Sequence, residues 1–174
     1  MEKKFFIDNN YMKKLLLIIS SLFVLLPIMA TEEQQLAFPT AEGFGRFATG
    51  GRMTDPAIGA NVYYVTRLDD CTDANLVEGT LRWALRTGDD TPRTILFKVG
   101  GTIKLESKLK FEHPNVSILG QSAPGGGICI SGANIYVCKN NVIIRYVRFR
   151  AGDEANSNYS ALDIENIQNC IIDH

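Results

Sequence analysis

Four carboxylates lie close together near the end of the sequence. Asp153 and Glu154 fall in a stretch that reads as a loop, and Asp163 and Glu165 fall in a β-rich run. If the apolar neighbours of Asp163 and Glu165 point inward, strand alternation places both carboxylates on the outer face. Carboxylate oxygens on one face could coordinate a cation, or they could simply be solvated by water. We take all four residues as candidate metal ligands.

A repeated pattern indicates what positions these carboxylates. Asn115-Val116-Ser117-Ile118, Asn141-Val142-Ile143-Ile144 and Asn169-Cys170-Ile171-Ile172 recur at intervals of 141 − 115 = 26 and 169 − 141 = 28 residues. A period in the twenties with one β-rich unit per period is typical of a solenoid, and here predicts a parallel β-helix. An Asn at the same bend of successive coils can stack and share amide hydrogen bonds. Each copy follows a second β-rich run, namely Leu109-Lys110-Phe111, Ile135-Tyr136-Val137 and Leu162-Asp163-Ile164.

One helix is predicted ahead of the repeats. From Thr80 onward, Leu81, Ala84 and Leu85 fall on a single helical face, and Gly88 is a stop signal. A solenoid needs its first open coil covered by an element unlike the repeats. We therefore expect a short N-terminal capping helix, with Trp83 acting as a hydrophobic plug or as a residue that stacks on a sugar.

The first thirty residues read as a secretory signal. Lys13 and Lys14 precede an apolar run from Leu15 to Ala30, with cleavage expected near Ala30. The run is shorter than a membrane span prefers, so a stable anchor is not expected. Met12 is an alternative start to Met1. We expect a tether over 31–36, a loop, strand and capping-helix region over 37–92, and the first coils over 93–174. The expected location is secreted or periplasmic.

Composition excludes some classes of function. The chain has 174 residues, of which 45% are hydrophobic and 21% charged, with a net charge of −1, and this gives no basic excess for nucleic acid. Four cysteines allow disulfides in an oxidising compartment. Cys129, Cys138 and Cys170 lie in or beside Val/Ile-rich runs, however, where cysteine is typically a small buried apolar residue.

Several segments together resemble one family. In chain order they are Ala37-Phe38-Pro39 with Glu42-Gly43-Phe44-Gly45, Gly79-Thr80-Leu81-Arg82-Trp83-Ala84-Leu85, Pro92-Arg93-Thr94-Ile95-Leu96-Phe97, Gly120-Gln121-Ser122-Ala123-Pro124-Gly125, Val142 to Arg150, and Ile171-Ile172-Asp173-His174. This ordered set resembles the N-terminal part of exported pectate lyases over about residues 37–174. The resemblance implies a right-handed single-stranded parallel β-helix. It also implies β-elimination of polygalacturonate, an acidic polysaccharide of plant cell walls, by a protein that is monomeric at full length.

The resemblance further implies a calcium ion and an arginine base. Calcium would bind the substrate carboxylate and stabilise the enolate-like intermediate. The family commonly has an Asp where this sequence has Asn158-Tyr159-Ser160, so the implied ligand set is incomplete. The implied catalytic Arg would lie beyond His174, so no residue of this chain is assigned to catalysis.

The resemblance also bears on the polar residues of the last two matching segments. Asp173 and His174 could suggest a catalytic dyad, but in the family this motif belongs to a strand and we expect it to be structural. If Val142 to Arg150 form one strand, Arg148 and Arg150 share a face with Tyr146, and Arg145 lies on the opposite face. The Arg148/Arg150 pair either binds acidic sugar or decorates an outer face.

The sequence stops within a strand after roughly three coils, where a solenoid would need a cap. We therefore expect a truncated β-helix, the N-terminal fragment of a longer lyase, which would be inactive and poorly stable alone. Two alternatives stay open. One is a non-catalytic β-helix that binds polysaccharide, and the other is a galacturonan hydrolase with paired carboxylates.

Overall fold

The computed structural model describes residues 10, 12–14, 17, 34–152 and 160–174. The chain divides into two compact units, Met1–Gln34 and Gln35–His174. Most of the expected signal segment and the first half of the expected tether fall outside the described residues, as do Asp153, Glu154, Asn158 and Tyr159. No described helix is long and apolar enough to cross a membrane.

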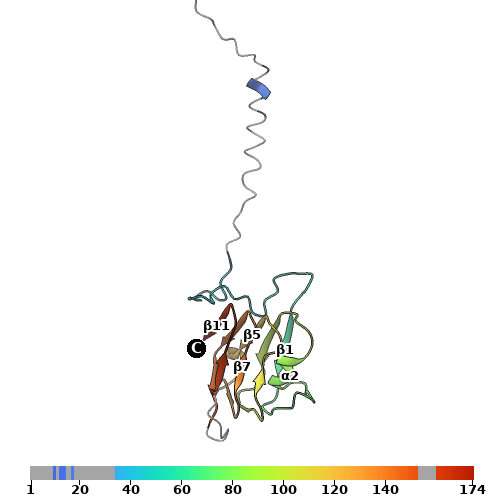
Figure 1. The fold of residues 1–174 in the computed structure, drawn as a ribbon, viewed down its shortest axis with the longest axis vertical. Helices are drawn as coiled ribbons and strands as arrows, with labels where there is room; N and C mark the ends of the chain where they lie inside the picture. Colours follow the sequence, from blue (N-terminus) through green and yellow to red (C-terminus); the bar gives the residue numbers. More distant parts are fainter. Residues whose placement is uncertain (1–9, 11, 15–16, 18–33, 153–159) are drawn as a thin grey trace, which may run out of the picture. The chain divides into compact units, whose positions relative to one another are not determined.

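The second unit is built from parallel strands in three sheets (Figure 1). The chain visits the sheets in turn, so strands that follow one another in sequence lie in different sheets and strands one coil apart pair. The five-stranded sheet contains β1 (Asn61–Val65), β2 (Arg93–Phe97), β5 (Val116–Leu119), β8 (Val142–Arg145) and β11 (Cys170–Asp173). The β3 sheet contains β3 (Gly101–Lys104), β6 (Ile128–Ser131) and β9 (Val147–Arg150). The β4 sheet contains β4 (Leu109–Lys110), β7 (Ile135–Val137) and β10 (Leu162–Ile164).

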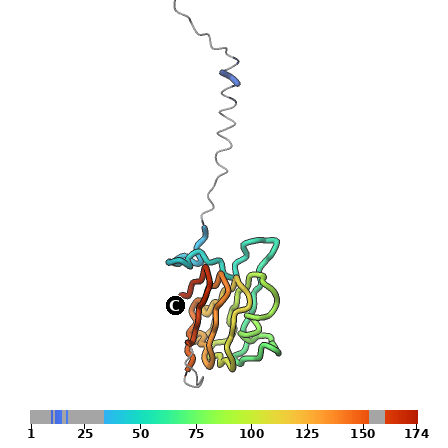
Figure 2. Tube along the Cα trace, viewed as in Figure 1, coloured from blue at the N-terminus to red at the C-terminus, as the bar shows by residue number. Residues whose placement is uncertain are grey.

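This order makes each coil one strand from each sheet. Strands β2 to β4, β5 to β7 and β8 to β10 are successive coils, and β11 begins the next one. The coils lie side by side in chain order (Figure 2). The predicted repeats are in register, because Val116 pairs with Val142 and Val142 pairs with Cys170. The predicted parallel β-helix is confirmed.

The repeated asparagines sit at the bends that precede β5, β8 and β11. Asn115, Asn141 and Asn169 have φ values of 58°, 63° and 54°, in the left-handed region that Asn tolerates better than most residues. The Asn141 amide donates to Asn115 Oδ1 at 2.7 Å. The predicted sharing of amide hydrogen bonds between coils therefore occurs between these two residues.

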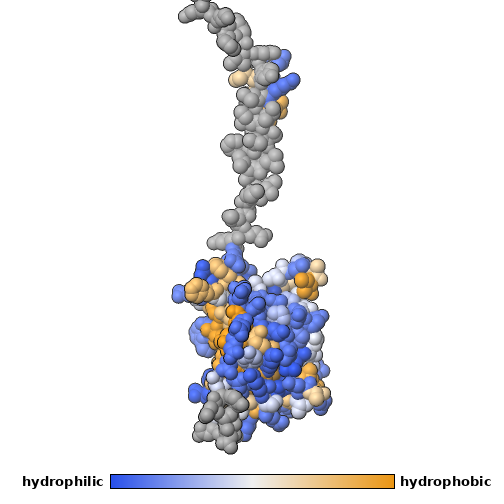
Figure 3. Space-filling view, viewed as in Figure 1, coloured by the Kyte–Doolittle hydropathy of each residue, from blue (hydrophilic) through white to orange (hydrophobic). Residues whose placement is uncertain are grey.

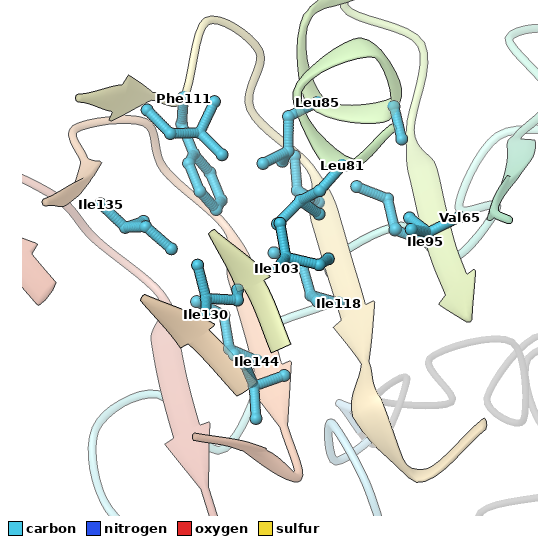
Figure 4. Packing of buried hydrophobic residues seen from close by; sticks show 14 of the residues in the cluster. Val65, Leu81, Leu85, Ile95, Ile103, Phe111, Ile118, Ile130, Ile135 and Ile144 are labelled. Atoms are coloured by element: carbon cyan, nitrogen blue, oxygen red, sulfur yellow. The ribbon is translucent and has the colours of Figure 1, made fainter. Parts of the chain in front are cut away.

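The core lies between the three sheets and under the helix α2 (Leu81–Arg86). Thr80 caps α2, because its hydroxyl accepts from the Trp83 backbone N–H at 3.1 Å. Leu81 and Leu85 are 1% exposed and point into the same core as Ile103 and Ile118 (Figure 4). Trp83 is half-buried against the Tyr63 ring, with ring centroids 5.3 Å apart. The capping helix is confirmed, and Trp83 packs as an apolar residue.

The glycine-rich segment over 37–52 crosses the outer face of the five-stranded sheet. Asn141 Oδ1 accepts from the backbone N–H groups of Thr49 and Gly50 at 2.8 and 3.1 Å, and Gly51 N–H donates to Ser117 Oγ at 2.9 Å. A Cβ on Gly51 would stand 2.0 Å from the Arg93 carbonyl oxygen. Only glycine allows so close an approach of backbone to sheet.

The last described coil is less covered than those before it. Ile164 and Ile172 continue inward-facing columns, since they pair with Val137 and Ile144, which are 0% and 1% exposed. Ile164 and Ile172 themselves are 43% and 40% exposed. Hydrophobic residues gather where β11 lies, beside a largely hydrophilic surface (Figure 3).

The bend between β8 and β9 corrects one expectation from the sequence. Residues 142–150 do not form a single strand, because Tyr146 has a φ of 56° and turns the chain from one sheet to the next. Arg145 therefore faces outward on the five-stranded sheet instead of sharing a face with Val147. Arg148 and Arg150 face outward on the β3 sheet.

All four cysteines are free thiols. Cys71 and Cys129 are buried, and Cys138 and Cys170 are half-buried. Burial raises the pKa of the Cys170 thiol to about 11, so this thiol is protonated at neutral pH.

A short 3₁₀ helix, Gly120–Ser122, joins β5 to the glycine turn that leads into β6. The Ser122 hydroxyl accepts from the Phe97 backbone N–H at 2.8 Å and donates to the Leu119 carbonyl at 2.7 Å. The side chain thus ties this turn to the preceding coil.

Candidate functional site

The outer face of the β4 sheet carries the candidate ligands that the structure describes. Leu109, Ile135 and Leu162 share one register, with the first two buried in the core. Alternation therefore turns Lys110, Tyr136 and Asp163 outward, in register with one another. The prediction that Asp163 lies on the outer face is confirmed. We call Lys108, Lys110, Tyr136, Asp163 and Glu165 the β4 face.

Tyr136 occupies the middle of the β4 face. Its hydroxyl donates to Glu165 Oε2 at 3.0 Å, and the Lys108 ammonium lies 4.0 Å from the centre of its ring. The hydrogen bond to Glu165 is the main cause that raises the pKa of the Tyr136 phenol. Tyr136 is therefore a hydrogen-bond donor at neutral pH and cannot serve there as a base.

The buried Asn134 side chain holds Asp163 through a hydrogen bond. This side chain is 4% exposed, and its amide donates to Asp163 Oδ2 at 3.1 Å and to the Ser160 carbonyl oxygen at 2.7 Å. Asn134 Oδ1 is buried and has no hydrogen-bond partner among the described residues. Sequence reasoning missed Asn134, Tyr136 and Lys108. The sequence does contain a signal for Tyr136. This residue occupies the position in its repeat that Asp163 occupies one coil later.

The described part of the β4 face does not by itself make a metal centre. Within the part of the chain that the structure describes, no three His, Cys, Asp or Glu side chains gather where they could hold a metal ion. Calcium takes six to eight oxygen ligands. Asp163 and Glu165 supply carboxylates of suitable chemistry, but each already accepts a hydrogen bond from Asn134 or Tyr136. The other two candidate ligands, Asp153 and Glu154, lie outside the described residues.

The Asp173–His174 pair lies on the five-stranded sheet instead. Asp173 accepts hydrogen bonds from Arg145 Nε at 2.7 Å and from His174 Nδ1 at 2.8 Å, and the Arg145 guanidinium stacks 3.7 Å from the Phe38 ring centre. Partial desolvation raises the pKa of Asp173, but the bonds from His174 and Arg145 outweigh that effect and lower it overall. The Asp173 carboxylate thus joins two coils through Arg145, and Arg145 in turn contacts the 37–52 segment at Phe38.

The fold defines the class of protein, a parallel β-helix with ionisable groups on the outer faces of its sheets. Comparison with solved structures agrees. The crystal structure of Jun a 1, the major allergen from cedar pollen, superposes with a TM-score of 0.59 over 77% of this chain and 41% of that chain. The two sequences are 21% identical, so this likeness establishes the fold alone.

Sequence comparison gives the particular relatives. The chain is 39% identical to the probable pectate lyase C of Emericella nidulans and 36% identical to that of Aspergillus terreus, each over 88% of this chain. It spans 33% of the length of each of these relatives. No family model matches the sequence. The predicted resemblance to the pectate lyase family is confirmed.

Proposed function

We propose that this chain forms part of a pectate-lyase-like enzyme that cleaves polygalacturonate or pectin by calcium-assisted β-elimination. The similarity to proteins named probable pectate lyase C carries the proposal. The chain spans 33% of those relatives, so the activity belongs to the whole enzyme and not to residues 1–174 alone. The basic residues and apolar run near the beginning of the sequence support export of the protein. A polysaccharide substrate would be found outside the cell.

The β4 face has groups that suit an acidic sugar. Lys108 and Lys110 are exposed ammonium groups for uronate carboxylates, and Tyr136 lies beside them with its hydroxyl bonded to Glu165. Asp163 and Glu165 are the described carboxylates for a divalent cation, which when bound would acidify the proton next to the substrate carboxylate. Asn134 holds Asp163 in place.

The β4 face as described has no arginine that could act as the base which the family resemblance implies. Tyr136 is kept protonated by its bond to Glu165, and the family resemblance implies an arginine for proton removal. None of the arginines of the described chain lies on the β4 face. We therefore propose that residues 1–174 alone bind the polysaccharide and do not cleave it.

The test is to incubate the purified chain with polygalacturonate in calcium and in EDTA. We expect calcium-dependent binding and no product with a new double bond. Asp163→Asn should weaken the calcium-dependent binding by about tenfold, because one charged ligand is lost. The matched control is Glu78→Gln, which removes an exposed carboxylate that has no contact with the β4 face.

Two results would contradict the proposal. Equal calcium-dependent binding of polygalacturonate by Asp163→Asn and wild type would show that the β4 face is not part of the binding site. Unsaturated products from the chain alone would show that the cleavage machinery is complete within it.

A non-catalytic polysaccharide-binding protein is the second candidate. The observation that favours it is Ser160, which stands where the family commonly has an acid and offers Asn134 only its backbone carbonyl. Binding that persists without calcium, in a full-length protein that forms no product, would identify this function. New reducing ends without a double bond would instead identify a hydrolase.

A further inference from the structure

A hollow lies where the 37–52 segment crosses the outer face of the five-stranded sheet. Its volume is about 340 Å³, which falls within the range of pockets that hold small ligands. Thr49 and Arg52 line it from the segment, and Thr94, Ser117 and Arg145 line it from β2, β5 and β8. A ligand in this hollow would therefore contact two parts of the chain that are far apart in sequence.

The charged side chains that line this hollow are arginines. Arg52 and Arg145 are among the described lining residues, and no described carboxylate is. Arg52 is half-buried, donates to the carbonyl oxygens of Leu36 and Ala48, and forms no ion pair with another described residue. Asp173 pairs with Nε and Nη2 of Arg145 and leaves its Nη1 without a described hydrogen-bond partner. The hollow therefore carries a net positive charge.

Two hydroxyl groups on its walls have hydrogens left to donate. Ser117 Oγ accepts from the Gly51 backbone N–H at 2.9 Å, and the Thr49 hydroxyl accepts from the Asn141 amide. Neither hydroxyl donates to an acceptor among the described residues. Ser117 is only 6% exposed, so bulk water has little access to its hydroxyl. A buried donor without an acceptor is unfavourable, and an oxygen of a bound anion would supply the acceptor.

Two further donors line the same space. Gln121 is exposed and its side chain makes no hydrogen bond with another described residue, so its amide is available to a ligand. The Thr94 hydroxyl lies 3.4 Å from the Gly51 carbonyl oxygen, which is a long and weak hydrogen bond. Guanidinium, hydroxyl and amide donors around one positively charged space suit the several oxygens of an oxyanion.

We infer that this hollow binds a small free oxyanion of the size and charge of inorganic phosphate. The anion would bridge Arg52 on the segment and Arg145 on the sheet, so its binding holds the 37–52 segment against the five-stranded sheet. The inference goes beyond the proposed function and does not rest on it. None of the lining residues belongs to the β4 face, and the site needs neither calcium nor polysaccharide.

Isothermal titration calorimetry of the full chain with inorganic phosphate, at constant ionic strength in chloride, measures this binding. We expect one site per chain. Phosphate at tenfold its dissociation constant should also raise the midpoint of thermal unfolding by about 4 °C, because the ion binds only the folded chain.

Gln121→Glu tests the hollow with little cost to the fold, because the Gln121 side chain has no described hydrogen bond to lose. The new carboxylate would face the anion and should raise the dissociation constant for phosphate at least about tenfold. The matched control is Gln168→Glu, the same substitution at an exposed position that does not line the hollow. This control should bind phosphate as the wild type does.

Arg52→Gln tests the charge on the segment and should weaken phosphate binding by about tenfold. Its matched control is Arg46→Gln, which removes an exposed arginine of the same segment. Arg46 also donates to a backbone carbonyl oxygen, that of Gly43, but it does not line the hollow, so this variant should bind phosphate normally. Thermal unfolding of each variant without phosphate checks that the fold is intact.

Three outcomes would overturn the inference. If the wild-type chain gives no heat of phosphate binding, the hollow holds only water. If Gln121→Glu binds phosphate as tightly as the wild type, the ion binds elsewhere. If Gln168→Glu or Arg46→Gln loses as much affinity as its test variant, the attraction is a general effect of charge. Loss of phosphate binding in Gln121→Glu, with unchanged calcium-dependent binding of polygalacturonate, separates this site from the β4 face.

Discussion

At the residue scale, Asn141 joins three parts of the molecule. Its Oδ1 accepts from Thr49 and Gly50, and its amide donates to Asn115 and to the Thr49 hydroxyl. The recurrence of Asn predicted the bond between coils. The bonds to Thr49 and Gly50 could not be predicted, because they depend on where a segment about ninety residues earlier crosses the sheet.

Asn141 lends itself to a comparison of two substitutions. Asn141→Gly keeps the backbone at a φ of 63° unstrained and loses the side-chain hydrogen bonds, each worth about 1 kcal/mol. Asn141→Ala loses the same bonds and adds about 1 kcal/mol of left-handed strain. We expect urea unfolding to rank stability as wild type, then Gly, then Ala. Equal stability of the two variants would contradict a role for backbone conformation. The control is Asn75→Ala, at an exposed position whose side chain makes no hydrogen bond with another described residue.

Residue identity misled the sequence interpretation at Tyr146. A non-glycine residue with positive φ is uncommon, and for a bulky side chain it gives no signal in a single sequence. The sequence therefore predicted one continuous strand across Tyr146. This prediction placed Arg145 on the inward face with Val147, whereas Arg145 faces outward. Asn134 was missed for a related reason, since a buried Asn before a strand looks the same in sequence as an exposed one.

At the element scale, strand position in a coil decides what each side chain contributes. Ile144 and Ile172 are paired in one inward column of the five-stranded sheet, one coil apart. Ile144 is 1% exposed and Ile172 is 40% exposed. The period predicted the column, but the sequence alone could not predict this difference, because exposure depends on which coils lie on either side.

This pair makes a matched test of packing. Ile144→Ala should lower the free energy of unfolding by about 2–5 kcal/mol, as expected for a large-to-small change in a core. Ile172→Ala removes the same atoms from a half-open position and should cost clearly less. Chemical denaturation of both variants measures the difference. Equal losses would mean that the last coil is covered in solution by something that the described residues do not provide.

At the scale of the whole molecule, the capping helix covers the first coil through a buried charge as well as apolar contacts. Arg82 is 0% exposed and binds both oxygens of Asp70 at 2.9 and 2.8 Å. It also donates to Asp73 and to the carbonyl oxygens of Ser107 and Lys108, in the turn between β3 and β4. The apolar face of the helix was predictable from its period. Burial of Arg82 was not, because it requires three separate segments to meet.

Arg82 should therefore be essential for holding this end of the solenoid closed. Arg82→Met keeps most of the apolar stem but leaves the Asp70 carboxylate, 1% exposed, without its counter-charge. We expect a loss of about 3–5 kcal/mol in the free energy of unfolding, the usual cost of breaking a buried ion pair from one side. Arg86→Met is the control on the same helix, since Arg86 pairs with the half-exposed Asp73 and Glu112 and should cost under about 1 kcal/mol. Fluorescence of Trp83, the single tryptophan, reports unfolding from within the helix itself. If Arg82→Met unfolds at the same urea concentration as Arg86→Met, apolar packing of Leu81 and Leu85 is sufficient to close the solenoid.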